Sequence, residues 1–151
     1  MTHYEDAEQK ALFEWAQYQP CAGGKMSTFL VHIPNGGYRK PQEAARLKSL
    51  GVTPGVSDLL FPLPRLGYHG LWIEMKRQLK HFRTPAEAKA AVSHEQQSWL
   101  TLMKLHQYAG AVCYGADEAM RLLTGYASGN REEFHRVYDV LLYRFHRPAG
   151  T

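Results

Sequence analysis

Two acidic residues and a lysine, placed in two short apolar segments, are the side chains of this sequence best suited to catalysis. Asp58 lies in segment 56–61, and Glu74 and Lys76 lie in segment 70–76. Because side chains alternate between faces along a strand, Glu74 and Lys76 should share one face while Met75 points to the other. Ionised groups rarely lie in such segments unless they are paired or bound to a metal ion. The spacing therefore predicts a buried site made of two carboxylates and one ammonium group.

The chemistry that suits this site is metal-dependent hydrolysis of a phosphodiester. A bound divalent cation acidifies water and neutralises phosphoryl oxygens, and Mg²⁺ prefers hard oxygen ligands. We expect Mg²⁺ or Mn²⁺, held by Asp58, Glu74 and the backbone carbonyl of Met75. Lys76 would hold or deprotonate the attacking water, or stabilise the extra charge on phosphorus. The ordinary alternative is an acid and a lysine on a solvent-facing strand, which the apolar neighbours Trp72, Ile73 and Met75 disfavour.

The elements that must position these residues alternate between helix and strand patterns. Helical patterns are expected over residues 5–19, 41–50, 93–108, 116–126 and 131–145, and strand patterns over 29–33, 56–61, 70–76 and 111–114. Segment 77–92, which is basic and then rich in alanine, is expected to be partly mobile. The alternation predicts an α/β fold with a mixed central sheet flanked by helices and an extra C-terminal helix.

The chain divides into a main domain, residues 1–127, and a C-terminal extension, residues 128–151. The extension contains the apolar stretch 138–145. An exposed apolar helix face usually marks an interface, and a two-fold dimer is the commonest way to cover it. We therefore expect the extension to be an interface element of a homodimer.

Composition limits the classes of protein to consider. The 151 residues are 44% hydrophobic and 21% charged, with a net charge of +4 and a pI near 9.1, values compatible with a globular domain that binds nucleic acid. No apolar run approaches the roughly 18–20 residues that span a bilayer, and the polar N-terminus is no secretory signal. Two cysteines are too few for a disulfide framework or a zinc site. We expect a cytoplasmic protein with no membrane partner.

Four motifs follow one another in this order along the chain. They read HIPNGGxR from position 32, GVTPGVSD from position 51, GLWIEMK from position 70 and SHEQxxWL from position 93. This series resembles the VRR-NUC domain, the virus-type replication and repair nuclease branch of the PD-(D/E)xK superfamily. The resemblance covers roughly residues 4–127, and Ser57 stands where the superfamily name has proline.

The resemblance implies a restriction-endonuclease-like core and a metal-dependent DNA endonuclease. It implies Asp58 and Glu74 as metal ligands and Lys76 as the catalytic lysine. Such families also use a glutamate of the first helix to bind metal, directly or through water, and Glu5 and Glu8 compete for this role. We favour Glu8 because it shares a helix face with apolar residues of the same helix. Either carboxylate could instead simply interact with the helix dipole.

Two further features have both a functional and a structural interpretation. Gln96 matches the family motif and could reach the metal-bound water or a phosphate, but with Ser93 it also forms a capping-box pattern. The Asn-Gly-Gly turn could bring backbone amides close to a phosphate, but it is also an ordinary tight turn. The candidate nucleic-acid contacts are His32, Asn35, Gly36, Gly37, Arg39, Lys40, Arg46, Lys48, Arg77, Lys80 and Arg83.

The substrate expected from the resemblance is branched DNA. Small stand-alone members are associated with such structures, and a homodimer with two active sites would suit symmetric cleavage of a four-way (Holliday) junction in DNA recombination and repair. The alternatives are a flap-type or less specific DNA nuclease, a nuclease for RNA or single strands, and a non-catalytic DNA-binding module. A short basic nuclease of this type suits a phage that grows in a bacterial host.

Overall fold

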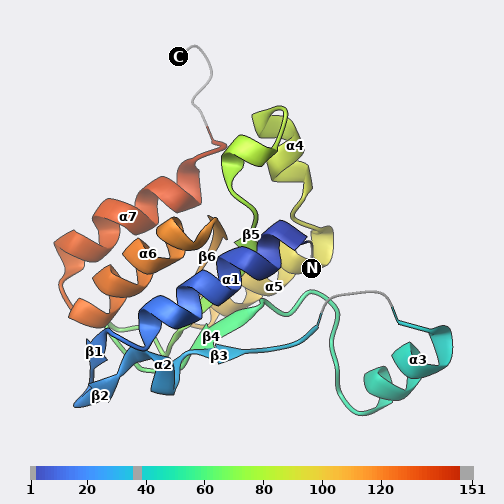
Figure 1. The fold of residues 1–151 in the computed structure, drawn as a ribbon, viewed down its shortest axis with the longest axis horizontal. Helices are drawn as coiled ribbons and strands as arrows, with labels where there is room; N and C mark the ends of the chain where they lie inside the picture. Colours follow the sequence, from blue (N-terminus) through green and yellow to red (C-terminus); the bar gives the residue numbers. More distant parts are fainter. Residues whose placement is uncertain (1–2, 36–38, 147–151) are drawn as a thin grey trace.

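The computed structural model describes residues 3–35 and 39–146, and its centre is a four-stranded sheet (Figure 1). The strand order is β3-β4-β5-β6, with bounds β3 Val31–His32, β4 Leu59–Phe61, β5 Leu71–Lys76 and β6 Ala109–Tyr114. β4 pairs antiparallel with both β3 and β5, whereas β5 and β6 are parallel. The predicted α/β fold with a mixed central sheet is confirmed.

Helices cover the sheet and connect its strands (Figure 1). They are α1 His3–Ala16, α2 Met26–Phe29, α3 Pro41–Ser49, the 3₁₀ helix η1 Leu79–His81, α4 Pro85–Ala90, α5 His94–Leu105, α6 Ala116–Ser128 and α7 Arg131–Tyr143. A small hairpin of β1 Pro20–Cys21 and β2 Gly24–Lys25 follows α1. Among the described residues, no helix is long and apolar enough to cross a membrane.

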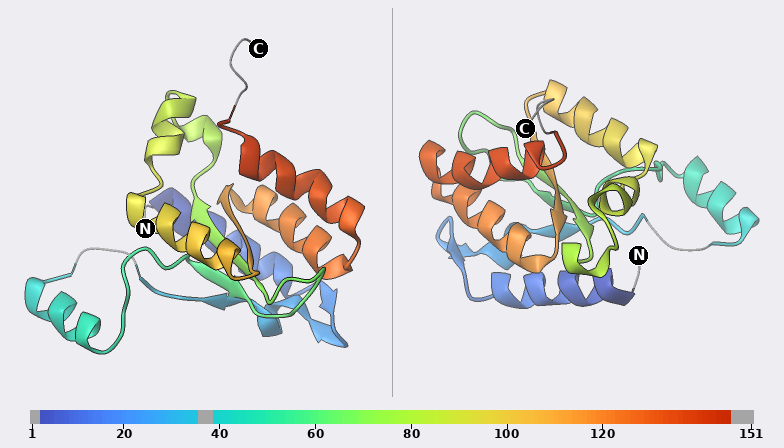
Figure 2. Two further views of the ribbon diagram at one scale, coloured as in Figure 1. Left: turned by 180° about the vertical axis from the view of Figure 1, so that it is seen from behind. Right: turned by 90° about the horizontal axis from the view of Figure 1, so that it is seen from above.

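The two faces of β5 meet different helices (Figure 2). Ile73 and Met75 join the main core, together with residues of α1 and α6 such as Leu12 and Leu123. On the opposite face, Trp72 packs edge-on against Trp99 of α5. This alternation places Glu74 and Lys76 on the α5 face of the strand, as the period of two predicts.

Segment 77–92 is more regular than its composition suggested, since it contains η1 and α4, and its partial mobility stays a prediction. The Thr84 hydroxyl accepts a hydrogen bond from the Glu87 backbone N–H, and Pro85 occupies the first turn of α4. Both are strong helix-start signals. Ala88 and Val92 then pack against Tyr114 of β6 in a second small core.

The apolar side of α7 is covered within the chain itself. Phe134, Tyr138 and Leu141 are buried in the main core, and the Tyr138 hydroxyl donates to the Gly110 carbonyl of β6. The extension thus completes the domain, and its buried stripe does not require a partner. Val140 and Tyr143 remain 64% and 65% exposed.

Helix α3 differs from the other long helices because it lies away from the sheet (Figures 1 and 2). None of its residues is buried. The chain leaves the sheet after β3, passes through α3 and returns to the sheet immediately before β4. The predicted helix is present, but its separation from the core is a property that the helical pattern alone does not reveal.

Candidate active site

Asp58 is positioned by the start of β4. Leu59 pairs with Ile73 across the two antiparallel strands, so Asp58 lies just before this ladder. Its carboxylate Oδ2 accepts a hydrogen bond of 2.8 Å from the backbone N–H of Met75. The side chain thereby takes the place of a strand partner and brings the carboxylate to the edge of β5, beside Glu74.

The Met75 carbonyl lies on the same side of β5 as Asp58. Within a strand, the N–H and C=O of one residue point to the same edge, and those of the next residue point to the other. Met75 N–H points to Asp58, while the Lys76 carbonyl accepts from Gly115 N–H on the β6 side at 2.9 Å. The Met75 carbonyl therefore faces the Asp58 edge, where the sequence placed it.

Glu74 is the most deeply buried charged group of the site, with 2% of its surface exposed. Its Oε1 accepts a hydrogen bond of 2.8 Å from Gln96 Nε2. Its Oε2 is buried and accepts no hydrogen bond from an N–H group of the described residues, although the protonated pair can share a hydrogen bond between Glu74 and Asp58. A buried carboxylate oxygen without a donor is costly, so this atom is suited to accept a ligand.

Burial raises the tendency of both carboxyl groups to hold a proton, and the charge of Asp58 adds to this effect at Glu74. The pKa of Glu74 is raised from its ordinary value of 4.5 to about 9, first by burial and then by the charge of Asp58. Burial also raises the pKa of Asp58, against the opposing effect of the Met75 N–H. The pair therefore keeps a proton near neutral pH. A divalent cation between the carboxylates would replace it.

Lys76 is 7% exposed and faces acceptor oxygens from three elements. Its ammonium group donates to Gln96 Oε1 at 3.2 Å. It lies 3.8 Å from Glu74 Oε1 and 3.9 Å from Glu5 Oε1. A buried ammonium needs such partners, and together they fix the position of its charge beside the carboxylates.

Gln96 forms the predicted capping box and also contacts the candidate site, while its contact with a metal-bound water or a phosphate stays a prediction. Its Oε1 accepts from the Ser93 backbone N–H at 2.9 Å, and the Ser93 hydroxyl accepts from the Gln96 N–H. This is a complete capping box. The same amide group also bonds Glu74 and Lys76, so the cap of α5 holds the side chain that links the two charged groups.

The first helix presents Glu5, rather than Glu8, to the site. Glu5 is buried and lies beside Lys76. Both oxygens of Glu8 are occupied elsewhere, by Gln78 Nε2 at 2.6 Å and by the Ala116 backbone N–H at 2.7 Å. Glu8 thus caps the start of α6, a structural role that corrects our preference for it. The sequence correctly predicted the face of α1 that points to the sheet, but it did not predict that Glu5, one turn earlier than Glu8, is the residue that reaches Lys76.

The turn after β3 is held to the Asp58 segment by its first residues. The Asp58 carbonyl accepts from the Ile33 backbone N–H at 2.7 Å and contacts His32 Nδ1 at 2.9 Å. Asn35 donates its side-chain amide to the Thr53 carbonyl. Arg39 reaches the Pro34 carbonyl at 3.4 Å. The predicted contacts Gly36 and Gly37 lie outside the described residues.

The remaining basic candidates divide into two groups. Lys40, Arg46 and Lys48 belong to α3 and its N-terminal flank, where all three are exposed. Arg77 follows β5, stacks over Phe82 at 4.2 Å and approaches Glu87 at 3.6 Å, so its charge is partly satisfied within the chain. The second group also includes Lys80 and Arg83, which are both exposed in or near η1.

The sequence analysis missed the close packing between Gly55 and α5. Gly55 has a φ of +87°, and a Cβ at this position would lie 2.7 Å from the Glu95 Cβ and overlap the Glu95 backbone. Only glycine allows this approach. Glu95 precedes Gln96, so the segment that leads to Asp58 rests directly on the turn that holds Gln96. Gly55 belongs to the GVTPGVSD motif, so the sequence did contain a sign of this close approach.

The residues of the site form a reasonable ligand set for a hard cation. Among the residues that the structure describes, no three His, Cys, Asp or Glu side chains gather in a way that would hold a metal ion by themselves. Mg²⁺ commonly uses only one or two carboxylates, with water and phosphate completing an octahedron. Asp58, Glu74 and the Met75 carbonyl match this pattern. The oxygen donors suit Mg²⁺ or Mn²⁺ and do not suit zinc.

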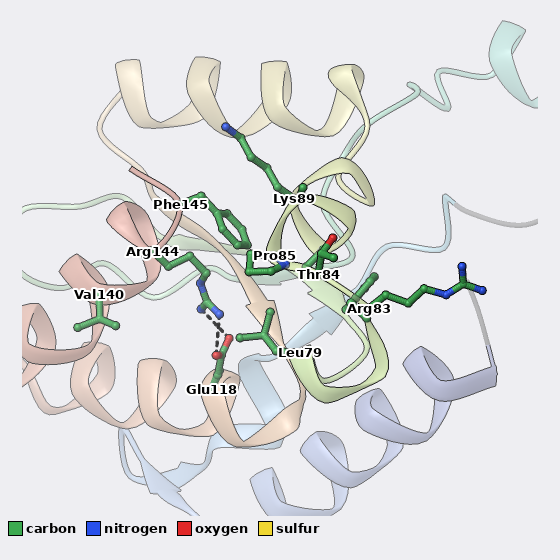
Figure 3. Close-up of a pocket in the computed structure, with 12 residues that line it drawn as sticks. Leu79, Arg83, Thr84, Pro85, Lys89, Glu118, Val140, Arg144 and Phe145 are labelled. Carbon is green, nitrogen blue, oxygen red and sulfur yellow. Dashed lines mark hydrogen bonds and ion pairs between the residues drawn. The ribbon is translucent and has the colours of Figure 1, made fainter. Parts of the chain in front are cut away.

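A hollow of about 740 Å³ lies elsewhere, between η1, α4 and α7 (Figure 3). Glu118 and Arg144 point toward one another at its edge and form a bidentate ion pair of 2.7 and 2.8 Å. Of the predicted site residues, only Arg83 lines it, and its side chain points away from Arg144 in Figure 3. This hollow is therefore separate from the carboxylates and Lys76.

Comparison with known proteins relates the fold to one solved structure in particular. No protein-family model and no curated protein matches the chain. A solved structure named "VRR_NUC domain protein" is similar, with a TM-score of 0.67 and 26% sequence identity. The similarity covers 85% of this chain and 91% of the other, so it extends over most of the fold.

Proposed function

We propose that this chain, whose resemblance to the VRR-NUC domain is confirmed by a solved structure of the same fold, is a nuclease that hydrolyses phosphodiester bonds of DNA with a divalent metal ion. The observation that carries the proposal is the buried group of Asp58, Glu74 and Lys76, linked by Gln96. Two carboxylates buried side by side are destabilising unless a proton or a cation lies between them. A binding module without catalysis would gain nothing from such a pair.

The ligands of the proposed ion are Asp58, Glu74 and the Met75 carbonyl. When bound, Mg²⁺ or Mn²⁺ would supply Lewis acidity and neutralise charge on the phosphate. Glu5, which replaces Glu8 in the proposal, lies beside Lys76 and could contribute through water. The Glu74 oxygen without an N–H donor supports this assignment.

Lys76 would act on the side of the phosphate that faces α5. Its ammonium group has a fixed position, because Gln96 Oε1 accepts one of its hydrogens. A fixed positive charge in a site of low polarity stabilises the negative charge that develops on phosphoryl oxygens during attack. Lys76 would also orient the attacking water, since its nitrogen carries two further N–H donors besides the one given to Gln96.

The more specific proposal is cleavage of branched DNA, with a four-way junction cut by a homodimer. The motif resemblance supports it, and Val140 and Tyr143 leave exposed apolar surface on α7. The burial of the rest of that helix face removes one reason to expect a dimer. Flap cleavage is the alternative within the same chemistry. Light scattering would give the mass in solution, and a monomer would contradict paired incision.

The test of the function uses labelled four-way junction, flap, linear duplex, single-stranded DNA and RNA. Each is incubated with the protein and Mg²⁺, Mn²⁺ or EDTA. We expect metal-dependent cleavage, strongest on a branched substrate. Absence of cleavage of every substrate by folded protein would refute the nuclease assignment, and cleavage of RNA alone would change the substrate class.

A further inference from the structure

The α3 arm, residues 39–57, is the part of the described chain least explained by the stability of the domain. Its helix buries no residue and lies apart from the other helices (Figures 1 and 2). An isolated helix of 9 residues is marginal in water, because most helical stability in proteins comes from packing. A segment with so little packing is suited to contact another molecule.

The base of the arm is attached firmly to the candidate active site. The arm ends one residue before Asp58, whose carbonyl accepts from the Ile33 N–H. Gly55 seats the returning segment on the first turn of α5, directly beside Gln96. The arm therefore projects from the site itself, and a molecule bound at Glu74 and Lys76 passes close to its base.

The charge of the arm identifies the kind of partner. It contains four basic side chains and one acidic side chain, so it carries +3 of the chain's net charge of +4. The acidic residue, Glu43, is paired with Arg46 at 3.0 Å, in a solvent-exposed position. The basic residues of the arm are Arg39, Lys40, Arg46 and Lys48.

A polyanion fits this surface better than a second copy of the chain. Two identical arms brought together would place like charges side by side, which is unfavourable. The apolar surface of the arm is small, with Leu50 as its only exposed large apolar side chain. Exposed lysine and arginine side chains are typical contacts to phosphate, which position a protein on DNA without reading its sequence.

We propose that the α3 arm binds the phosphate backbone of duplex DNA next to the bond that is cut. This rests on the proposed nuclease function for its location, but the binding itself does not depend on hydrolysis. Each phosphate that the arm neutralises releases condensed counterions, so the contribution appears in the salt dependence of affinity. The contact would hold a double-stranded segment of the substrate and would not distinguish base sequences.

The experiment compares the wild type with the triple variant Lys40→Gln, Arg46→Gln and Lys48→Gln. Affinity for labelled linear duplex and four-way junction is measured in EDTA over a range of salt concentrations. The control is Arg121→Gln, Arg131→Gln and Arg136→Gln, which removes equal charge from exposed residues of α6 and α7. Circular dichroism and light scattering check the fold and the mass.

We expect the slope of log affinity against log salt to fall by about 2.7 in the arm variant, since each phosphate contact contributes about 0.9. The control should retain most of the wild-type slope. Between ~50 and ~200 mM salt, the wild type should then lose about 40-fold more affinity than the arm variant. The loss should be equal for duplexes of different sequence. Single variants at Lys40 and Lys48 should each lower the slope by about 0.9, and they provide the test if the triple variant fails to fold.

Three results would overturn the proposal. The first is an unchanged slope in the arm variants, and the second is absence of DNA binding by the wild type. The third is a change of solution mass with an unchanged slope, which would make the arm an interface between copies. Cleavage in Mn²⁺ is measured separately. Binding through the arm without cleavage would refute the nuclease function alone, and cleavage with an unchanged slope would refute the arm alone.

Discussion

The candidate active site and the α3 arm both carry charge, but in opposite environments. Glu74 and Lys76 are buried and held by hydrogen bonds to Gln96, whereas the arm's Lys40 and Lys48 are exposed. Buried charges are strongly coupled and sensitive to position. Exposed charges are screened and contribute little singly. The function of the candidate active site should therefore depend on the positions of individual atoms, whereas DNA binding by the α3 arm should depend on its total charge.

The two regions are also physically joined. The arm returns to the sheet through Gly55, which rests on α5, and then through Asp58. The proposed catalytic group therefore lies at the base of the proposed binding surface.

The largest expected effect is on catalysis, from Lys76→Met. Removal of a positioned catalytic group should lower the rate of cleavage by about 10²–10⁴-fold, while methionine preserves the apolar stem. Lys10→Met is the matched control, because Lys10 is an exposed lysine of α1 with no proposed role in binding or catalysis. Single-turnover cleavage is the measurement. If both variants cut equally well, the buried region has no special role.

Gly55→Ala should disturb the junction between the two regions. The added Cβ would overlap the Glu95 backbone, so we expect the free energy of unfolding to fall by about 1–3 kcal/mol more than in the control. The control is Gly51→Ala, which has a φ of +100° but open space around the added Cβ. Urea denaturation measures the difference. Equal losses in the two variants would show that only backbone strain matters.

The free energy of unfolding should depend on pH in a way that distinguishes the buried carboxylates from the exposed ones. The pKa of Glu74 is raised to about 9 in the folded protein, so its stabilisation is complete below about 4.5 and is lost as pH rises through 9. Without metal, this group should lower the free energy of unfolding by up to about 1.4 kcal/mol per pH unit in that window. Urea titrations of wild type and Glu74→Gln isolate the effect. A pH dependence that is the same in both proteins would contradict it.

Stability without metal should fall as pH rises, whereas affinity for the metal ion should increase. Because the cation displaces the proton on the carboxylates, apparent Mn²⁺ affinity should rise by up to about tenfold per pH unit below 9. Calorimetric titration at several pH values measures this rise. Affinity that does not change with pH would indicate a site built from other groups.

The smallest expected effect belongs to a single exposed charge of the arm. Lys48→Gln should weaken DNA binding only a few-fold at moderate salt, because one phosphate contact is lost among several. Fluorescence anisotropy with a labelled duplex is sufficient to detect it. If Lys48→Gln reduced DNA affinity by a factor as large as the loss of cleavage in Lys76→Met, the two regions would not differ in the way proposed.

Local patterns and the order of the motifs were sufficient to predict that the candidate catalytic residues lie together. The period of two placed Glu74 and Lys76 on one face of β5, and the motif order brought Asp58 beside them. The capping box of α5 was readable from Ser93 and Gln96. These features depend on neighbours within a few residues, which is why the sequence alone reveals them.

Tertiary arrangement decided the features that the sequence did not predict. Glu5 and Glu8 lie on nearly the same helix face, and only the position of α1 against β5 and α6 determines which one reaches Lys76. The helical pattern of residues 41–50 says nothing about whether a neighbour covers it. Similarly, the apolar residues of α7 looked suited to a partner, because the pattern of a single helix does not show that α6 and β6 cover it.

The most direct test of the central claim is an anomalous diffraction map from crystals soaked with Mn²⁺ at a pH near 9. We predict a Mn²⁺ peak in contact with carboxylate oxygens of Asp58 and Glu74 and with the Met75 carbonyl, and no such peak in Glu74→Gln. A map of the folded wild-type protein without a peak between the two carboxylates would contradict the account.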